Sequence, residues 1–164
     1  ISHKHSCWLV LFSGWSTTLR NSRLSSHMTT KQKEKPRGIR NNNPLNIRIG
    51  NVWLGEVKEN TDGEFEQFTS MIYGLRAAIV LLRRYICHYH LSTIAQIVSR
   101  WAPSSENNTR LYINFVSERL GIANDVQIDF FDKGTICRLV EAMAKYECGS
   151  APPFDTIEKA YDLS

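Results

Sequence analysis

Apolar residues recur every three or four positions along most of the chain after residue 70, a spacing that places them on one face of a helix. The pattern predicts five helices, with bounds of about 71–89, 92–101, 108–120, 132–148 and 155 onward. Residue types at the ends support these bounds, because Ser and Asp cap helix N-termini, glycine follows C-termini and proline cannot continue a helix. The end residues are Ser92, Pro103, Gly121, Asp132 and Gly149, with a capping-box pattern at Asp155 and Glu158.

The stretch before residue 70 has short runs of strand-forming residues separated by turn residues. The runs are 46–49, 52–54 and 64–68, and Asp62-Gly63 is a turn signal before the last of them. Residues 41–44, three asparagines and a proline, predict a tight turn because asparagine tolerates left-handed backbone conformations. The chain is therefore expected to be α+β and mainly α, with a small antiparallel hairpin or meander.

Charge and composition divide the chain into a tail and a domain. Residues 1–36 carry six Lys and Arg against one Glu and are expected to be a disordered basic tail. Residues 37–164 carry 14 basic and 15 acidic side chains, which is not the balance of a nucleic-acid-binding surface. We interpret residues 1–27 as sequence upstream of the working protein, because Met28 begins a plausible polar leader. The alternative is a targeting segment, for which the apolar run Cys7–Phe12 is short; it is also far too short for a membrane span.

The cysteines and histidines do not have the spacing of a metal site, so no metal and no cofactor are expected. Cys87 and Cys137 fall within helical patterns and are expected in the core, whereas the pairing of Cys148 is left open. His88 and His90 are expected at the surface.

One carboxylate stands out in the predicted helix 132–148. Ile136, Val140 and Met143 are four and three residues apart, and the next position of this apolar stripe is Glu147. Loss of hydration on an apolar face raises the pKa of a carboxyl, and the negative end of the helix acts in the same direction. A raised pKa suits a general acid near neutral pH. Glu147 is therefore a candidate proton donor; the alternative is that the stripe has reached solvent at a frayed helix end.

Other carboxylates have weaker claims. Glu118 and Glu141 lie off the apolar faces of their helices, and exposed charge is the ordinary condition for carboxylates near short strands. The carboxylates near the predicted strands are all expected to be solvated; they are Glu56, Glu59, Glu64 and Glu66.

Polar and aromatic residues cluster around the end of the second predicted helix and the start of the third. Trp101, Glu106, Asn107 and Tyr112 offer hydrogen bonds and an aromatic surface for a sugar, and Trp53 is a further aromatic candidate. Two interpretations stay open. These residues bind a substrate, or the aromatic rings pack in the core while the polar residues cap the next helix.

The domain resembles a family of phage and prophage virion-associated proteins with lysozyme-like domains. Members open with Arg-Gly-Ile-Arg-Asn-Asn-Asn-Pro-Gly-Asn-Ile-Arg, which here is the run Arg37 to Arg48 with Leu45 in place of glycine. The glycine-to-leucine change is expected to stiffen the turn or alter its geometry. Further matching segments are Trp53-x-Gly55, Phe65-x-x-Phe68, Gly74-x-Arg76-Ala77, Trp101-Ala-Pro, Glu106-Asn107-x-Thr109 and Glu147-Cys148-Gly149.

A weaker similarity is to flagellar and autolysin-type glucosaminidases and to lytic transglycosylases. In the glucosaminidases a helix ending in a catalytic Glu comes before an asparagine turn, whereas here Glu147 lies far behind the turn in the sequence. The similarity implies a circularly permuted lysozyme-like fold. In such a fold the helix 132–148 packs against the turn, next to Trp53.

These resemblances imply a glycosidase or lytic transglycosylase that cuts the glycan backbone of peptidoglycan. Glu147 would protonate the leaving oxygen, with Glu106 as the second choice for this role. Tyr112 and the turn residues Asn41, Asn42 and Asn43 would orient the substrate, and Trp53, Trp101, Glu106 and Asn107 would bind it.

The alternative is a virion structural or wall-binding protein with the same fold but no activity. The expected partners are peptidoglycan strands and other virion proteins, with no membrane and no nucleic acid, for a monomer in a virion or acting in the cell wall. A third possibility is that the basic tail binds nucleic acid at low salt.

Overall fold

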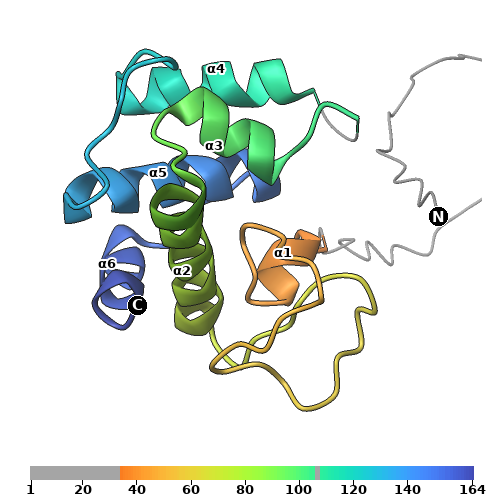
Figure 1. The fold of residues 1–164 in the computed structure, drawn as a ribbon. Coiled ribbons are helices and arrows are strands. Elements are labelled where there is room, and N and C mark those ends of the chain that lie inside the picture. Colours follow the sequence, from red (N-terminus) through yellow and green to blue (C-terminus); the bar gives the residue numbers. More distant parts are fainter. Residues whose placement is uncertain (1–33, 106–107) are drawn as a thin grey trace, which may run out of the picture. The chain divides into compact units, whose positions relative to one another are not determined.

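The structure is a computed structural model that describes residues 34–105 and 108–164, so residues 1–33 of the predicted tail lie outside the described residues. The compact unit Lys35–Ser164 is mainly α-helical (Figure 1). Its helices along the described residues are α1 (Arg37–Arg40), α2 (Met71–Tyr89), α3 (Ile94–Trp101), α4 (Thr109–Leu120), α5 (Lys133–Cys148) and α6 (Phe154–Asp162).

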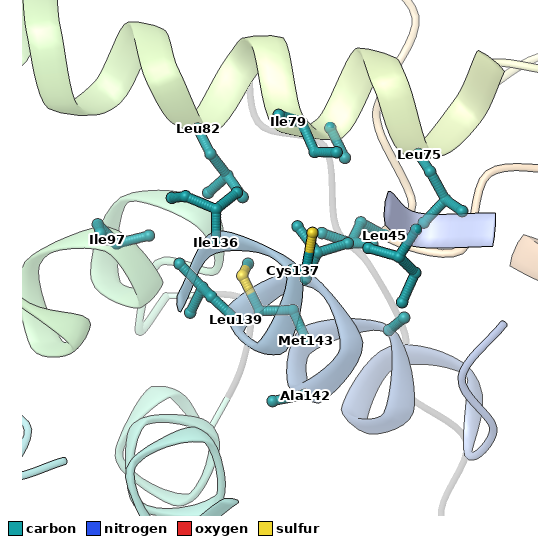
Figure 2. Close-up of a cluster of buried hydrophobic side chains, with 14 of the residues drawn as sticks. Leu45, Leu75, Ile79, Leu82, Ile97, Ile136, Cys137, Leu139, Ala142 and Met143 are labelled. Atoms are coloured by element: carbon teal, nitrogen blue, oxygen red, sulfur yellow. The ribbon is translucent and has the colours of Figure 1, made fainter. Parts of the chain in front are cut away.

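Helix α5 is the centre of the unit, since it packs against α1, α2, α4 and α6. Figure 2 shows the side chains of α2 and α5 meeting across the core, joined by Leu45 from the loop after α1 and Ile97 from α3. Each large apolar side chain buried in this way contributes about 1.5–3 kcal/mol relative to an exposed one. Those that are fully buried include Leu45, Leu75, Ile79, Leu82, Ile97, Ile136, Leu139 and Met143.

Helices α2 to α5 match the predicted helices to within two residues at each end. The predicted caps account for this agreement. The Asp132 carboxylate accepts from the Thr135 N–H at the start of α5, and Gly121 and Gly149 have left-handed conformations after α4 and α5. The cap of α3 is Thr93 rather than Ser92, and Gln96 completes a capping box there.

Two local predictions are wrong. Helix α6 begins at Phe154 after Pro153 and has no side-chain cap, so Asp155 lies inside the first turn instead of capping it. The predicted hairpin is also reduced, in the described residues, to the isolated antiparallel bridges Arg48–Phe65 and Glu56–Phe68 before α2. Backbone bonds join Ile49 to Glu64 and Glu66 to Ile47, but side chains such as Asn43 and Asp62 bond the neighbouring backbone, and no strand forms in this described stretch.

The cysteines divide between surface and core. Cys137 is fully buried, as predicted, but Cys87 is exposed near the C-terminal end of α2, where the apolar face of the helix no longer covers it. Cys87, Cys137 and Cys148 are all free thiols. His88 and His90 are exposed, as predicted.

Candidate functional site

The apolar stripe of α5 continues to the end of the helix. Ile136, Val140 and Met143 are fully buried, and Glu147, at the next position of the stripe, is half-buried one residue before the helix ends. A half-buried position both restricts hydration of the carboxyl and leaves part of it open to a ligand.

The loop after α1 packs against this end of α5. The Asn46 side-chain amide donates to Glu147 Oε2 at 3.0 Å. The Cys148 thiol donates to the Pro44 carbonyl, with 3.3 Å between sulfur and oxygen. Gly38 of α1 leaves room for that thiol, because a Cβ added at Gly38 would lie 2.6 Å from Cys148 Sγ. Residues about a hundred positions apart in the sequence therefore meet at the end of α5.

Burial dominates the electrostatics of Glu147. It raises the pKa of the carboxyl above its ordinary value, and the hydrogen bond from Asn46 and the nearby Tyr112 hydroxyl partly oppose this shift. Glu147 is therefore protonated at a higher pH than a solvated glutamate.

Tyr112, also predicted at the site, lies beside Glu147. It is buried, and burial followed by the charge of Glu147 raises its pKa well above the ordinary value. The Tyr112 hydroxyl lies close to the Glu147 carboxyl, but it forms no well-aligned hydrogen bond with an atom of the described residues. Its ring stacks on Tyr146, with centroids 4.0 Å apart and planes 14° apart.

The three consecutive asparagines predicted to bind substrate use their side-chain amides within the fold. Asn41 donates to Asp62 at 2.9 Å, and Asn42 donates to the Phe68 carbonyl at 2.9 Å. Asn43 is fully buried and donates to the carbonyls of Ile47 and Glu66. These bonds hold the loop before α2 against the turn; a role in binding substrate stays a prediction.

The aromatic candidates are partly in the core. Trp53 and Trp101 are half-buried and pack against it, and the Trp101 indole N–H donates to the Leu45 carbonyl at 3.2 Å. The Trp53 indole N–H is buried without a partner in the described part of the chain. Glu106 and Asn107 lie outside the described residues.

Sequence patterns missed two residues beside Glu147. Asn46 has a left-handed conformation, with φ of 52°. Its position within the asparagine-rich motif was the one sequence feature that could have indicated a role at the site. Tyr146 precedes Glu147, is 37% exposed and stacks on Tyr112, but it lies off the apolar stripe and so carried no periodic signal. The leucine in the motif does not strain the turn: Leu45 is a fully buried core residue with an ordinary negative φ.

A second acidic group lies in the loop before α2. Glu66 was expected to be solvated but is only 2% exposed, with its carboxyl accepting from the Gly50 N–H at 3.2 Å. Glu56 lies next to it and accepts from the Trp53 N–H at 2.9 Å. Burial, and then the hydrogen bond and charge of Glu56, raise the pKa of Glu66 to about 7. The prediction of a solvated Glu66 is therefore wrong.

A cavity of about 290 Å³ lies elsewhere, and none of its lining residues was predicted for the site. It is lined by Arg83, Ile86, Cys87, Phe130, Phe131 and Tyr161. Among the described residues, no three His, Cys, Asp or Glu side chains gather as they would around a metal ion. No helix in the described ranges has both the length and the apolar character needed to cross a membrane.

Comparison with known proteins relates the chain to a phage protein. Protein P5 of Pseudoalteromonas phage PM2 is 39% identical to it over 138 residues, which is 81% of this chain and 84% of that protein. The chain belongs to the same family as Protein P5. No model of a protein family matches the sequence. The expected relation to phage proteins is thus confirmed.

Proposed function

We propose that this protein cleaves the glycan backbone of peptidoglycan, with Glu147 as the proton donor and a lysozyme-like fold that is circularly permuted. The observation that carries the proposal is the Glu147 carboxyl itself, half-buried at the end of an apolar stripe and hydrogen-bonded by Asn46. Burial raises its pKa, which is the direction that favours the protonated form that a general acid in glycoside cleavage needs.

The reaction needs one acid at the leaving group. Protonated Glu147 gives its proton to the glycosidic oxygen as the bond from that oxygen to the sugar C1 breaks. The Glu147 carboxylate then accepts the proton of the muramyl 6-hydroxyl as this oxygen bonds to C1, which produces an anhydro-sugar. The side chains that act on the Glu147 carboxyl are Asn46 and Tyr112, with no second carboxyl among them in the described residues, which favours this single-carboxylate route over a two-carboxylate mechanism.

Two side chains support substrate binding at this carboxyl. The Tyr112 hydroxyl adjoins Glu147 and is proposed to orient the reacting groups. The partly exposed ring of Tyr146, held in place by stacking on Tyr112, suits the apolar face of a pyranose. The relation to a phage protein favours a setting in which a phage particle passes through the cell wall.

The test is a zymogram on purified peptidoglycan with the full chain, comparing wild type with Glu147→Gln. Glu141→Gln is the matched control, because Glu141 is also half-buried on α5 but lies off the stripe. We expect clearing by wild type and Glu141→Gln, and a loss of at least about 100-fold in Glu147→Gln, which is the contribution of a general acid.

Three other outcomes are informative. Equal clearing by wild type and Glu147→Gln would remove Glu147 from the mechanism. Reducing-end products without anhydro-sugars, seen by mass spectrometry, would replace the transglycosylase route by hydrolysis. Absence of clearing with all variants, together with cosedimentation with peptidoglycan, would favour the non-catalytic wall-binding alternative.

A further inference from the structure

The best-defined contact of the Glu147 carboxyl is its hydrogen bond with Asn46, a residue without an assigned role. We infer that Asn46 is a positioning residue that holds Oε2 of Glu147 so that the other carboxyl oxygen faces the glycosidic oxygen. The inference rests on the proposed function and adds to it the group that orients the acid.

The backbone at Asn46 is built for this contact. Its φ of 52° lies in the left-handed region, which asparagine tolerates better than most residues other than glycine. The Asn46 N–H donates to the Asn43 carbonyl at 3.0 Å, and the Ile47 N–H donates to Asn43 Oδ1 at 2.9 Å. Because Asn43 is fully buried, the backbone on both sides of the Asn46 Cα is fixed from the core.

The Asn46 amide is enclosed from two directions. A Cβ added at Gly38 would lie 2.8 Å from Asn46 Oδ1, so the amide oxygen packs closely over the glycine backbone. The amide nitrogen points the opposite way, to Glu147 Oε2 at 3.0 Å. This packing sets which end of the amide meets the carboxyl.

The other partner is equally fixed. Cys148 follows Glu147, is 6% exposed and bonds to the Pro44 carbonyl, two residues before Asn46. The end of α5 and the turn are thus joined by two hydrogen bonds, from consecutive residues of α5 to Asn46 and Pro44 of the turn. The Asn46–Glu147 pair is therefore held by packed backbone, unlike a surface pair between two long side chains.

The chemical type of the donor also fits a general acid. An Arg or Lys at this position would bind the carboxylate by its charge and lower its pKa by one to three units. A neutral amide orients the carboxyl with a smaller stabilisation of the charged form, so it opposes the effect of burial less than a cation would. Removing the amide is expected to raise the Glu147 pKa further, since the bond from Asn46 opposes the effect of burial.

Glycine substitution provides a matched pair of variants. Asn42 also has φ of 52° and also donates its amide, but to the Phe68 carbonyl. In Asn46→Gly and Asn42→Gly the left-handed backbone is retained without strain, and one side-chain amide is lost from each. The amide lost in Asn46→Gly donates to Glu147, whereas the amide lost in Asn42→Gly donates to the Phe68 carbonyl.

The experiment is a ¹³C NMR pH titration of the full chain, with the Glu147 carboxyl signal assigned by its loss in Glu147→Gln. We expect the Glu147 pKa to rise in Asn46→Gly and to stay at the wild-type value in Asn42→Gly. An unchanged pKa in Asn46→Gly, or an equal change in both variants, would overturn the inference whether or not the protein is active.

Peptidoglycan turnover then gives the second measurement. Asn46→Gly should lower kcat about tenfold or more with little change in KM, because the misaligned acid still allows binding. The alkaline limb of the pH profile should move to higher pH only in that variant. A wild-type chain without activity would refute the proposed function, but the titration would still test whether Asn46 governs the carboxyl.

Discussion

Buried Glu66, beside half-buried Glu56, predicts an unusual dependence of stability on pH. In the folded chain Glu66 is 2% exposed and its pKa is about 7, whereas a solvated glutamate has a pKa of 4.5. Between these values the unfolded chain has released the proton that the folded chain still holds. The native state then binds more protons than the unfolded state, so stability falls as pH rises from about 4.5 to about 7.

The size of this loss follows from the shift. Each pKa unit corresponds to about 1.4 kcal/mol, so the shift at Glu66 corresponds to a destabilisation of about 3 kcal/mol by pH 8. Because Glu56 shares the site, the proton is released by the pair, and the measured midpoint belongs to both carboxyls.

The perturbation is Glu66→Gln, which keeps the shape and an acceptor for the Gly50 N–H but cannot ionise. Urea unfolding followed by circular dichroism at pH 5, 6, 7 and 8 gives the free energy of unfolding of both proteins. Relative to wild type, the variant should gain about 2.5 kcal/mol of stability between pH 5 and pH 8, since a solvated glutamate is already mostly ionised at pH 5.

Glu59→Gln is the control for this measurement, because Glu59 is exposed in the same loop. The gain of Glu66→Gln at high pH should exceed that of this exposed control. A difference between Glu66→Gln and wild type that is also constant with pH would refute the assignment of a shared proton to this pair.

Other substitutions test the packing and chemistry around the asparagine turn. Leu45→Gly restores the glycine of the phage motif but removes a fully buried side chain, and should lower the free energy of unfolding by about 2–5 kcal/mol in urea titrations. Gly74→Ala places a Cβ 1.8 Å from the Asn42 carbonyl oxygen and should lower the melting temperature sharply; an unchanged melting temperature would contradict this close approach. Asn43→Ala removes the side-chain partners of the Glu66 carbonyl and the Ile47 N–H and should cost about 2–3 kcal/mol, against a smaller loss in Asn42→Gly, which removes one partly buried bond. The pH–rate profile of wild type should fall on its alkaline side as Glu147 loses its proton, and should lack this limb if another group is the acid.

The helices from α2 to α5 could be predicted because their signals are local. Each has an apolar stripe with helical period, and residues such as Asp132, Gly121 and Gly149 mark the ends. The same period indicated Glu147, since three buried residues on α5 lead to it at fixed spacing. The position of Glu147 on the apolar stripe of α5 could therefore be predicted from helical spacing alone.

The loop before α2 could not be predicted in the same way. Strand-forming residues suggested a hairpin, but the loop backbone is held by side chains from distant positions, such as the Asn43 amide on the Glu66 carbonyl. The burial of Glu66 depends on the course of this loop backbone. The alternation of polar and apolar residues in a short segment does not predict that course. Asn46 was missed because its importance comes from a contact across 101 residues with Glu147.

The most direct test of the central claim is the initial rate at which full-length protein releases soluble muropeptides from purified peptidoglycan near neutral pH. Circular dichroism of Glu147→Gln and Glu141→Gln first establishes that both variants are folded. Measurable release by wild type and Glu141→Gln, with a loss of about 100-fold or more in Glu147→Gln, is the predicted result. Release by folded Glu147→Gln at the wild-type rate would contradict the claim that Glu147 is the proton donor.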